Sequence, residues 1–257
     1  MIRLLLLLMF PLSLSAQWFR VSKETPVRFG MDYLYAAPLG NTRAGNPNSF
    51  VYGQAKNGNG FELLLSVPLR DKLYVSLSVK HTDFALDLDI VKGQLYEKFD
   101  DAQHYTNPNF LIRNTYTNYL GLDLSYLFHV GKFDVMPTLG MGWFNYESPG
   151  SRRAAIERKR QNSNYTETID LTPNGANSIY MGGGVRIYRK LFWVVDFSAG
   201  VFCLPAKVSV ETDVVVTDYM DNTISRGSFS SDLSVTSLQL EAGLRFRAWR
   251  GKKAHTE

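Results

Sequence analysis

Eight segments of the chain alternate apolar and polar residues with a period of two, and the gaps between them are in turn long and short. Side chains of a β-strand point alternately to opposite faces, so each segment is expected to be a strand with one apolar and one polar face. The segments cover residues 27–39, 61–68, 72–88, 116–130, 133–146, 178–188, 191–204 and 235–248. Long loops at about 40–60, 89–114, 147–177 and 205–234 alternate with tight turns at 69–71, 131–132 and 189–190. This order predicts an all-β, eight-stranded antiparallel up-and-down β-barrel.

The strand nearest the C-terminus shows the alternation most clearly. One face carries Leu238, Leu240, Ala242, Leu244 and Phe246, and the other carries Gln239, Glu241, Gly243, Arg245 and Arg247. The apolar face either meets lipid or packs inside a soluble sandwich or a lipocalin-like barrel. Aromatic residues near strand ends favour lipid, since such rings lie at the level of the headgroups. They are Tyr33, Tyr35, Trp143, Tyr146, Phe192, Trp193, Phe246 and Trp249.

The polar faces carry charges of both signs. The residues predicted to form a charge network in the lumen are Arg28, Asp32, Glu62, Lys80, Asp123, Asp134, Arg186, Asp196, Glu241 and Arg245. The interior of an eight-stranded barrel is just wide enough to be filled by side chains. Opposite charges can pair across it, which offsets the desolvation cost of burying them. The alternative, for a soluble fold, is that these side chains face water.

The N-terminus predicts export. Arg3 precedes an apolar run, Leu4–Phe10, and the small residues Ser15 and Ala16 follow, as in a secretory signal peptide (residues 1–16). The mature chain, 17–257, is then a single barrel domain. No other stretch reaches about 18 apolar residues, so no transmembrane helix is expected. An exported chain that crosses a membrane without one must be a closed barrel, because lipid offers the backbone no hydrogen-bond partner.

No motif predicts catalysis, a cofactor or a resident metal. The four His are scattered among different segments, and no paired metal-ligand spacing is present. Two weaker alternatives are a divalent cation at Asp100, Asp101 and His104, and a lipid-modifying enzyme that uses His81. The formal net charge of +4 gives no case for nucleic acid as a partner.

A basic run in the third long loop is the candidate contact for lipopolysaccharide. It consists of Arg152, Arg153, Arg158, Lys159 and Arg160. Guanidinium groups bind phosphate bidentately, so these residues suit the phosphates of that lipid. The alternative is a solvated loop tip, with a short helix.

Two further segments carry local predictions. Pro137 lies inside a predicted strand of a barrel without free edges, and proline cannot donate to the ladder. We therefore expect a bulge or a weakened hydrogen bond there. In the fourth long loop, Val208–Val216 is β-prone and is expected to extend the flanking strands in part.

Short motifs add a family resemblance. They are the signal peptide, Phe29-Gly30 in the first strand, Pro38-Leu39-Gly40 after it, and Gly-Leu-Arg-Phe-Arg at 243–247. Over the mature chain, the sequence resembles small eight-stranded outer-membrane β-barrel proteins, especially the divergent barrel families of Bacteroidota that include the PorT family.

The resemblance implies an integral protein of the cell outer membrane. Because such barrels have short periplasmic turns and long outer loops, the order of the gaps predicts that both termini lie in the periplasm. Its implied partners are outer-membrane lipid and lipopolysaccharide, the barrel-assembly machinery during insertion, and an envelope protein. The implied role is structural, adhesive or secretion-associated and is exercised through the long outer loops. The alternatives are porin-like transport of small solutes through a narrow channel, which a filled lumen argues against, and modification of membrane lipid.

Overall fold

The computed structural model describes residues 26–39, 55–86, 114–147, 152–160, 163–218 and 223–248. Within these ranges no helix is long and apolar enough to cross a membrane. The predicted signal peptide, the candidate cation site at Asp100, Asp101 and His104, and the aromatic Trp249 all lie outside the described residues.

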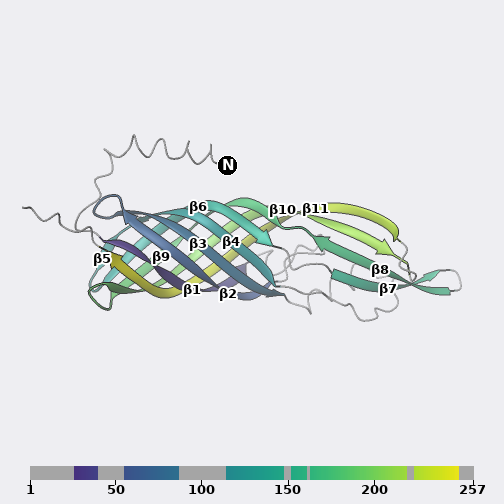
Figure 1. Cartoon of the computed structure of the whole chain (residues 1–257), viewed down its shortest axis with the longest axis horizontal. Helices are drawn as coiled ribbons and strands as arrows, with labels where there is room; N and C mark the ends of the chain where they lie inside the picture. Colours follow the sequence, from purple (N-terminus) through teal and green to yellow (C-terminus); the bar gives the residue numbers. More distant parts are fainter. Residues whose placement is uncertain are drawn as a thin grey trace, which may run out of the picture.

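The described residues form eleven strands of one antiparallel sheet. They are β1 (Val27–Leu39), β2 (Ala55–Pro68), β3 (Leu73–Leu86), β4 (Thr115–Tyr126), β5 (Phe128–Val130), β6 (Phe133–Glu147), β7 (Arg152–Arg160), β8 (Ser163–Pro173), β9 (Ala176–Lys190), β10 (Val195–Thr217) and β11 (Thr223–Ala248). A ring is formed by β1, β2, β3, β4, β6, β9, β10 and β11, and it closes because β11 pairs with both β10 and β1. The short β5 pairs with β6. The predicted eight-stranded antiparallel barrel is therefore confirmed (Figure 1).

Tight turns join the strands at one end of the barrel, which we call the turn end. They comprise residues 69–72, 131–132 and 191–194. Gly131 has a φ of 61°, the left-handed conformation that a two-residue hairpin turn requires. The third turn is not at 189–190 as predicted, because Arg189 and Lys190 continue β9 and pair with Phe197 and Asp196 of β10. Two positively charged side chains do not end a strand while its backbone is still paired with the next strand.

At the opposite end, the loop end, the barrel continues as a sheet extension. It consists of β7, β8, residues 204–217 of β10 and residues 223–237 of β11. β10 and β11 pair without interruption from Val195↔Phe246 to Val216↔Ser225. At about 3.3 Å per residue, β10 alone spans about 75 Å. The segment 205–234, predicted mainly as a loop, is therefore strand over nearly all of its described length, and Figure 1 shows it projecting from the barrel.

The segment 147–177, predicted as a loop, requires a second correction. It contains β7 and β8, which pair with each other from Arg152↔Leu171 to Arg160↔Ser163. The short helix considered for the basic run is wrong, because the run forms β7. β8 in turn pairs with Thr212–Thr217 of β10. The extended β10 offers unpaired backbone groups, and the hairpin satisfies them, which the local sequence alone does not predict.

The strand that contains Pro137 shows the expected weakness. β6 pairs with β4 as far as Thr138 and with β5 from Val135, so the ladder is interrupted opposite Pro137. The missing N–H of proline explains the interruption. On the other side, the register with β9 is unbroken, with Pro137 opposite Val185.

Candidate functional site

The outer surface of the barrel is apolar, and its interior is charged. Among the outward side chains, Ile179 is 77% exposed and Leu139 is 72% exposed. Among the inward ones, Arg186, Arg245 and Lys80 are each at most 2% exposed. This is the reverse of a soluble protein, in which charged residues are almost never fully buried and face water. The alternative in which the polar faces meet water is therefore wrong.

The alternation continues beyond the barrel, but the two faces exchange their character. The outward residues of β10 change from Phe197, Ala199 and Val201 to Lys207, Ser209, Glu211 and Asp213, while the inward ones change from Asp196 and Ser198 to Phe202, Leu204, Ala206, Val208 and Val210. On β11 the exchange falls between Thr236 and Leu238, and Leu238 pairs with Cys203 of β10. Two paired strands thus switch at the same height, as they must where both leave a nonpolar slab. The chain is a transmembrane β-barrel.

A row of polar side chains ends the apolar alternation of the outward face on four neighbouring strands. His81 Nδ1 lies 2.7 Å from Asn118 Oδ1, the Asn118 amide donates to Asn145 at 3.0 Å, and Asn145 donates to Asn177 at 3.0 Å. On each of these strands, the outward residue two positions nearer the turn end is apolar. These residues are Val79, Leu120, Trp143 and Ile179. The sequence analysis did not single out this row, although Asn at the end of an apolar alternation was the available signal.

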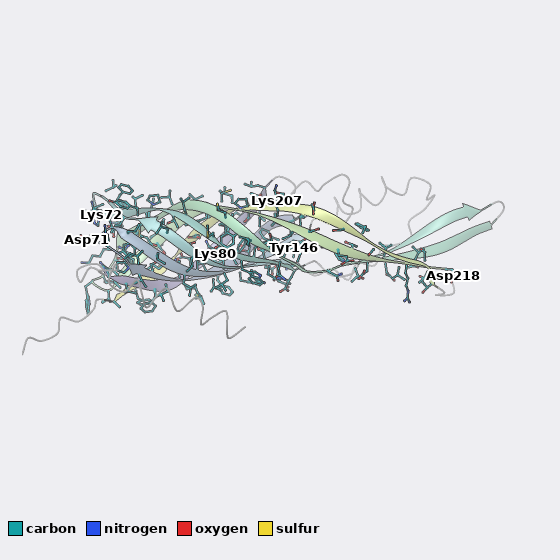
Figure 2. All side chains as sticks on the ribbon, turned by 90° about the horizontal axis from the view of Figure 1, so that it is seen from above. Asp71, Lys72, Lys80, Tyr146, Lys207 and Asp218 are labelled. Atoms are coloured by element: carbon teal, nitrogen blue, oxygen red, sulfur yellow. The ribbon has the colours of Figure 1, made fainter. Side chains whose placement is uncertain are left out.

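The middle of the lumen holds a connected ion-pair network. The Arg186 guanidinium contacts Glu62 at 2.6 Å, Glu241 at 3.0 Å and Asp123 at 3.3 Å. Lys80 Nζ lies 2.5 Å from Glu241 and 3.3 Å from Glu62. Figure 2 places Lys80 midway along the barrel. These side chains come from five strands, so the network ties opposite walls of the barrel together.

Arg245 of β11 extends this central network towards β1. It pairs with Asp32 and lies 3.4 Å from Glu62. The Ser198 hydroxyl also donates to Asp32, at 2.7 Å. All of these partners are buried, so each charge is compensated by protein and not by water.

The carboxylates of the central network do not need a metal ion. Asp32, Glu62 and Glu241 bring oxygens within 4.8 Å of one another, a spacing that a cation would fit. However, each of them already contacts a guanidinium or ammonium group of the protein. The arrangement suits a fixed structural charge network and not a metal centre.

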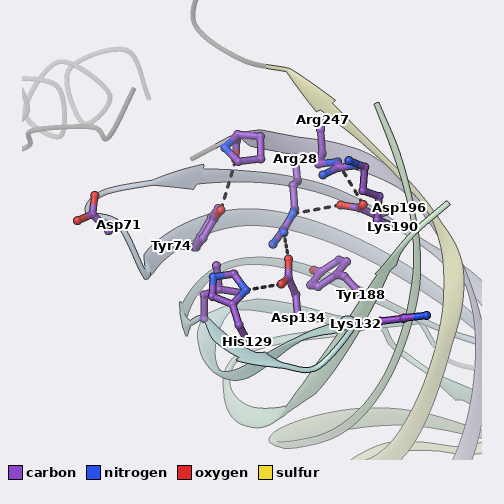
Figure 3. A pocket seen from close by; sticks show the side chains of 12 residues that line it. Arg28, Asp71, Tyr74, His129, Lys132, Asp134, Tyr188, Lys190, Asp196 and Arg247 are labelled. Carbon is purple, nitrogen blue, oxygen red and sulfur yellow. Dashed lines mark hydrogen bonds and ion pairs between the residues drawn. The ribbon is translucent and has the colours of Figure 1, made fainter. Parts of the chain in front are cut away.

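A second charged cluster lies at the turn end of the lumen (Figure 3). Arg28 pairs with Asp134 and lies 3.4 Å from Asp196, and Arg247 Nε lies 3.2 Å from Asp196. His129 Nδ1 lies 2.7 Å from Asp134. Each residue predicted for the lumen network falls in this cluster or in the central one. The alternation already places Arg247 on the inward face, yet the predicted set omitted it.

Apolar side chains fill the lumen beyond the central network, towards the loop end. Tyr119, Phe144, Tyr180 and Phe202 are buried there, with the Tyr119 ring 4.9 Å from Phe144 and 5.2 Å from Tyr180. The guanidinium carbon of Arg186 lies 4.3 Å from the centre of the Phe202 ring. Aromatic rings and ion pairs thus pack directly against each other and block the barrel axis.

The basic run is present as β7, and its side chains lie outside the part of the structure that describes burial and contacts. The backbone shows how far it is from the membrane. β7 reaches β10 through β8, which pairs with β10 only from Thr212 onwards. That is about 30 Å along the strand from the boundary at Cys203. The run is therefore well separated from the apolar band.

No protein-family model and no curated protein matches the sequence. Among solved structures it is similar to the outer membrane protein OprG from Pseudomonas aeruginosa, with 10% identity and a TM-score of 0.48 over 88% of this chain and 95% of that one. A major outer membrane protein from Thermus thermophilus matches with 15% identity and a TM-score of 0.43, over 85% of this chain and 100% of that one. The Neisserial surface protein A matches with 14% identity and a TM-score of 0.39, over 87% and 96%. These values carry no conclusion about family or activity.

Proposed function

We propose that this protein is an outer-membrane anchor that holds a stiff β-sheet extension outside the membrane, in a structural, adhesive or secretion-associated role. The observation that carries the proposal is the unbroken pairing of β10 with β11 across the boundary and far beyond it. A closed antiparallel barrel with an apolar outside is the architecture of bacterial outer-membrane barrels. In these proteins the short turns and both termini face the periplasm, and the same orientation here would put the extension at the cell surface.

The extension has the composition of a folded element in water. Its inward residues Val208, Val210, Leu233 and Val235 are at most 3% exposed, and they join the apolar cluster at the loop end of the lumen. Its outward residues on β10 include the polar side chains Lys207, Ser209, Glu211 and Asp213. The extension is thus continuous with the packed interior of the barrel, and a load on it is transmitted to the barrel through β10 and β11.

The position of β7 limits which partner the basic run can contact. β7 lies far above the boundary, so it suits phosphates on the distal sugars of lipopolysaccharide, or an envelope protein, better than phosphates at the headgroup level. We also propose that the barrel-assembly machinery inserts this chain into the membrane, and that the chain is one of the PorT-like barrels of Bacteroidota.

The packed lumen favours this role over transport. We expect the purified protein in a planar bilayer to give no steady conductance at neutral pH, because the central network and the rings above it fill the axis. Single-channel recording checks this. The matched comparison is a Phe202→Ala/Tyr119→Ala variant, in which removal of two buried rings is expected to raise the frequency of brief openings. Steady open channels in the unmodified protein would contradict the proposal.

The contacts of His81 favour a structural role over lipid chemistry. Its Nδ1 is hydrogen-bonded to Asn118, and its ring packs 5.5 Å from Phe61 and 5.7 Å from Tyr116. No hydroxyl group of the described residues is hydrogen-bonded to it, as a nucleophile would be.

The role of the extension can be tested by removing it. Lys207 pairs with Ser234, so residues 208–233 can be replaced by Asn-Gly, which closes a two-residue hairpin. In a deletion strain, we expect the full chain to restore cell attachment or the release of secreted proteins, and the shortened chain to restore neither.

Heat-modifiable electrophoretic mobility of the shortened chain is the control that its barrel still folds. A shortened chain that is folded and restores both phenotypes would show that the working surface is elsewhere.

A further inference from the structure

A pocket opens into the lumen at the turn end, where residues of the turns and of the turn-end charged cluster line it (Figure 3). Its volume is about 350 Å³, within the range of pockets that hold small molecules. Its inner wall consists of inward-facing residues, among them Arg28, Tyr74 and Tyr188. The pocket therefore opens along the barrel axis and not towards lipid, which excludes a membrane headgroup as its occupant.

The inner wall combines a guanidinium with two aromatic rings. Arg28 lies between them, with its guanidinium carbon 4.7 Å from the centre of the Tyr188 ring and 5.5 Å from that of Tyr74. Leu127 adds an apolar surface. A ligand with an apolar or aromatic body can pack against this wall.

The charge of the pocket favours an anion. Its inner acidic groups Asp134 and Asp196 are each held by cations of the protein, as described above, and the third, Asp71, is exposed on the turn between β2 and β3. Lys132 and Lys190 also line the pocket. Among the described residues, neither ammonium group is paired within 4.0 Å of a carboxylate, although Lys190 interacts at longer range with Asp196, opposite it on β10. Both lysines lie at exposed strand ends or turns, where they can reorient towards a ligand.

Arg28 also retains capacity to donate. Its Nη2 pairs with Asp134 and its Nε lies 3.4 Å from Asp196, but its Nη1 donates only to the thioether of Met136, at 3.2 Å. Sulfur is a weak acceptor, so a buried guanidinium that borders a pocket gains from a carboxylate oxygen.

We propose that this pocket binds a small organic anion, a carboxylate attached to an apolar or aromatic body. The carboxylate is held by Lys132, Lys190 and the Nη1 group of Arg28, and the body packs against Tyr74 and Tyr188. Two sources share this chemistry, a free aromatic acid and the C-terminus of a peptide that ends in an aromatic residue.

The test is calorimetric titration of the full mature chain, folded in detergent micelles. The probes are 3-phenylpropanoate for the free acid, acetyl-Ala-Phe for the peptide, 3-phenylpropanamide as the neutral analogue, and inorganic phosphate. We expect at least one carboxylate probe to bind about tenfold more tightly than the amide and than phosphate, because only it offers both features. The tighter of the two carboxylates identifies the source.

Two variants separate binding from folding. Lys132→Met/Lys190→Met removes only exposed charges and is expected to weaken carboxylate binding about tenfold while heat-modifiable mobility stays unchanged. Lys207→Met, at the loop end, is the matched control and is expected to bind normally. The proposal would be overturned if the acid and the amide bind equally tightly, or if both variants lose carboxylate binding equally. It would also be overturned if phosphate binds more tightly than the carboxylates, or if no probe binds.

Discussion

Replacement of Arg186 with Met is expected to lower the free energy of unfolding of the barrel by about 3–5 kcal/mol, the usual cost of removing one partner from a buried ion pair. Arg186 contacts Glu62, Asp123 and Glu241, and its loss leaves three buried carboxylates with too little positive charge. Urea titration in detergent micelles, followed by the mobility of unboiled samples, measures the change.

The same strand supplies a matched control. Arg189 lies three residues further along β9 and is exposed, and its side-chain contact among the described residues is with the face of Phe133, at 5.8 Å. Arg189→Met is expected to change the free energy of unfolding by less than about 1 kcal/mol. In Arg186→Met/Glu62→Gln, removal of one stranded carboxylate should recover part of the loss. If Arg186→Met unfolds at the same urea concentration as Arg189→Met, the central network does not stabilise the barrel.

The central network shows what the sequence can and cannot predict. A period of two is enough to place Glu62 and Arg186 on inward faces, because strand geometry leaves each side chain only two directions. It does not show that they meet: they are separated by 124 positions, and their contact depends on how the closed sheet is staggered.

The sheet extension was mostly missed for a different reason. Its strands keep the period of two, but apolar residues move from the outward to the inward face near Cys203. If the whole chain is assumed to lie in one solvent, such an inversion within a strand resembles the end of that strand. The β7–β8 hairpin depends further on the exposed edge of β10, a partner that local composition does not reveal.

The turn-end pocket could likewise not be predicted from the sequence. Its residues come from the ends of separate strands and from the turns, and each of them has an ordinary local role. Only closure of the barrel brings Arg28 of β1, Tyr74 of β3 and Tyr188 of β9 together. Arg28 was singled out as a charge in the lumen, but its aromatic neighbours were not.

The inversion of the two faces leads to the second large effect. Leu122, 58% exposed and central in the outward face of β4, is expected to tolerate Arg poorly when the barrel is folded in lipid bilayers. The expected cost is about 2–4 kcal/mol, as for a cation on the lipid face near the bilayer midplane. Urea titration of the barrel in phospholipid vesicles measures it.

Ser209→Arg is the matched control, since Ser209 is also outward and exposed but lies six residues beyond the boundary at Cys203. It is expected to leave the free energy of unfolding unchanged within about 0.5 kcal/mol. The comparison separates two explanations of the same burial pattern. If water surrounded the barrel, replacement of the exposed residue by Arg would be neutral at both positions. A large cost at Leu122 and none at Ser209 requires that the surrounding medium change between these two heights, and this is the property that makes the extension, and not the barrel wall, available to partners in water.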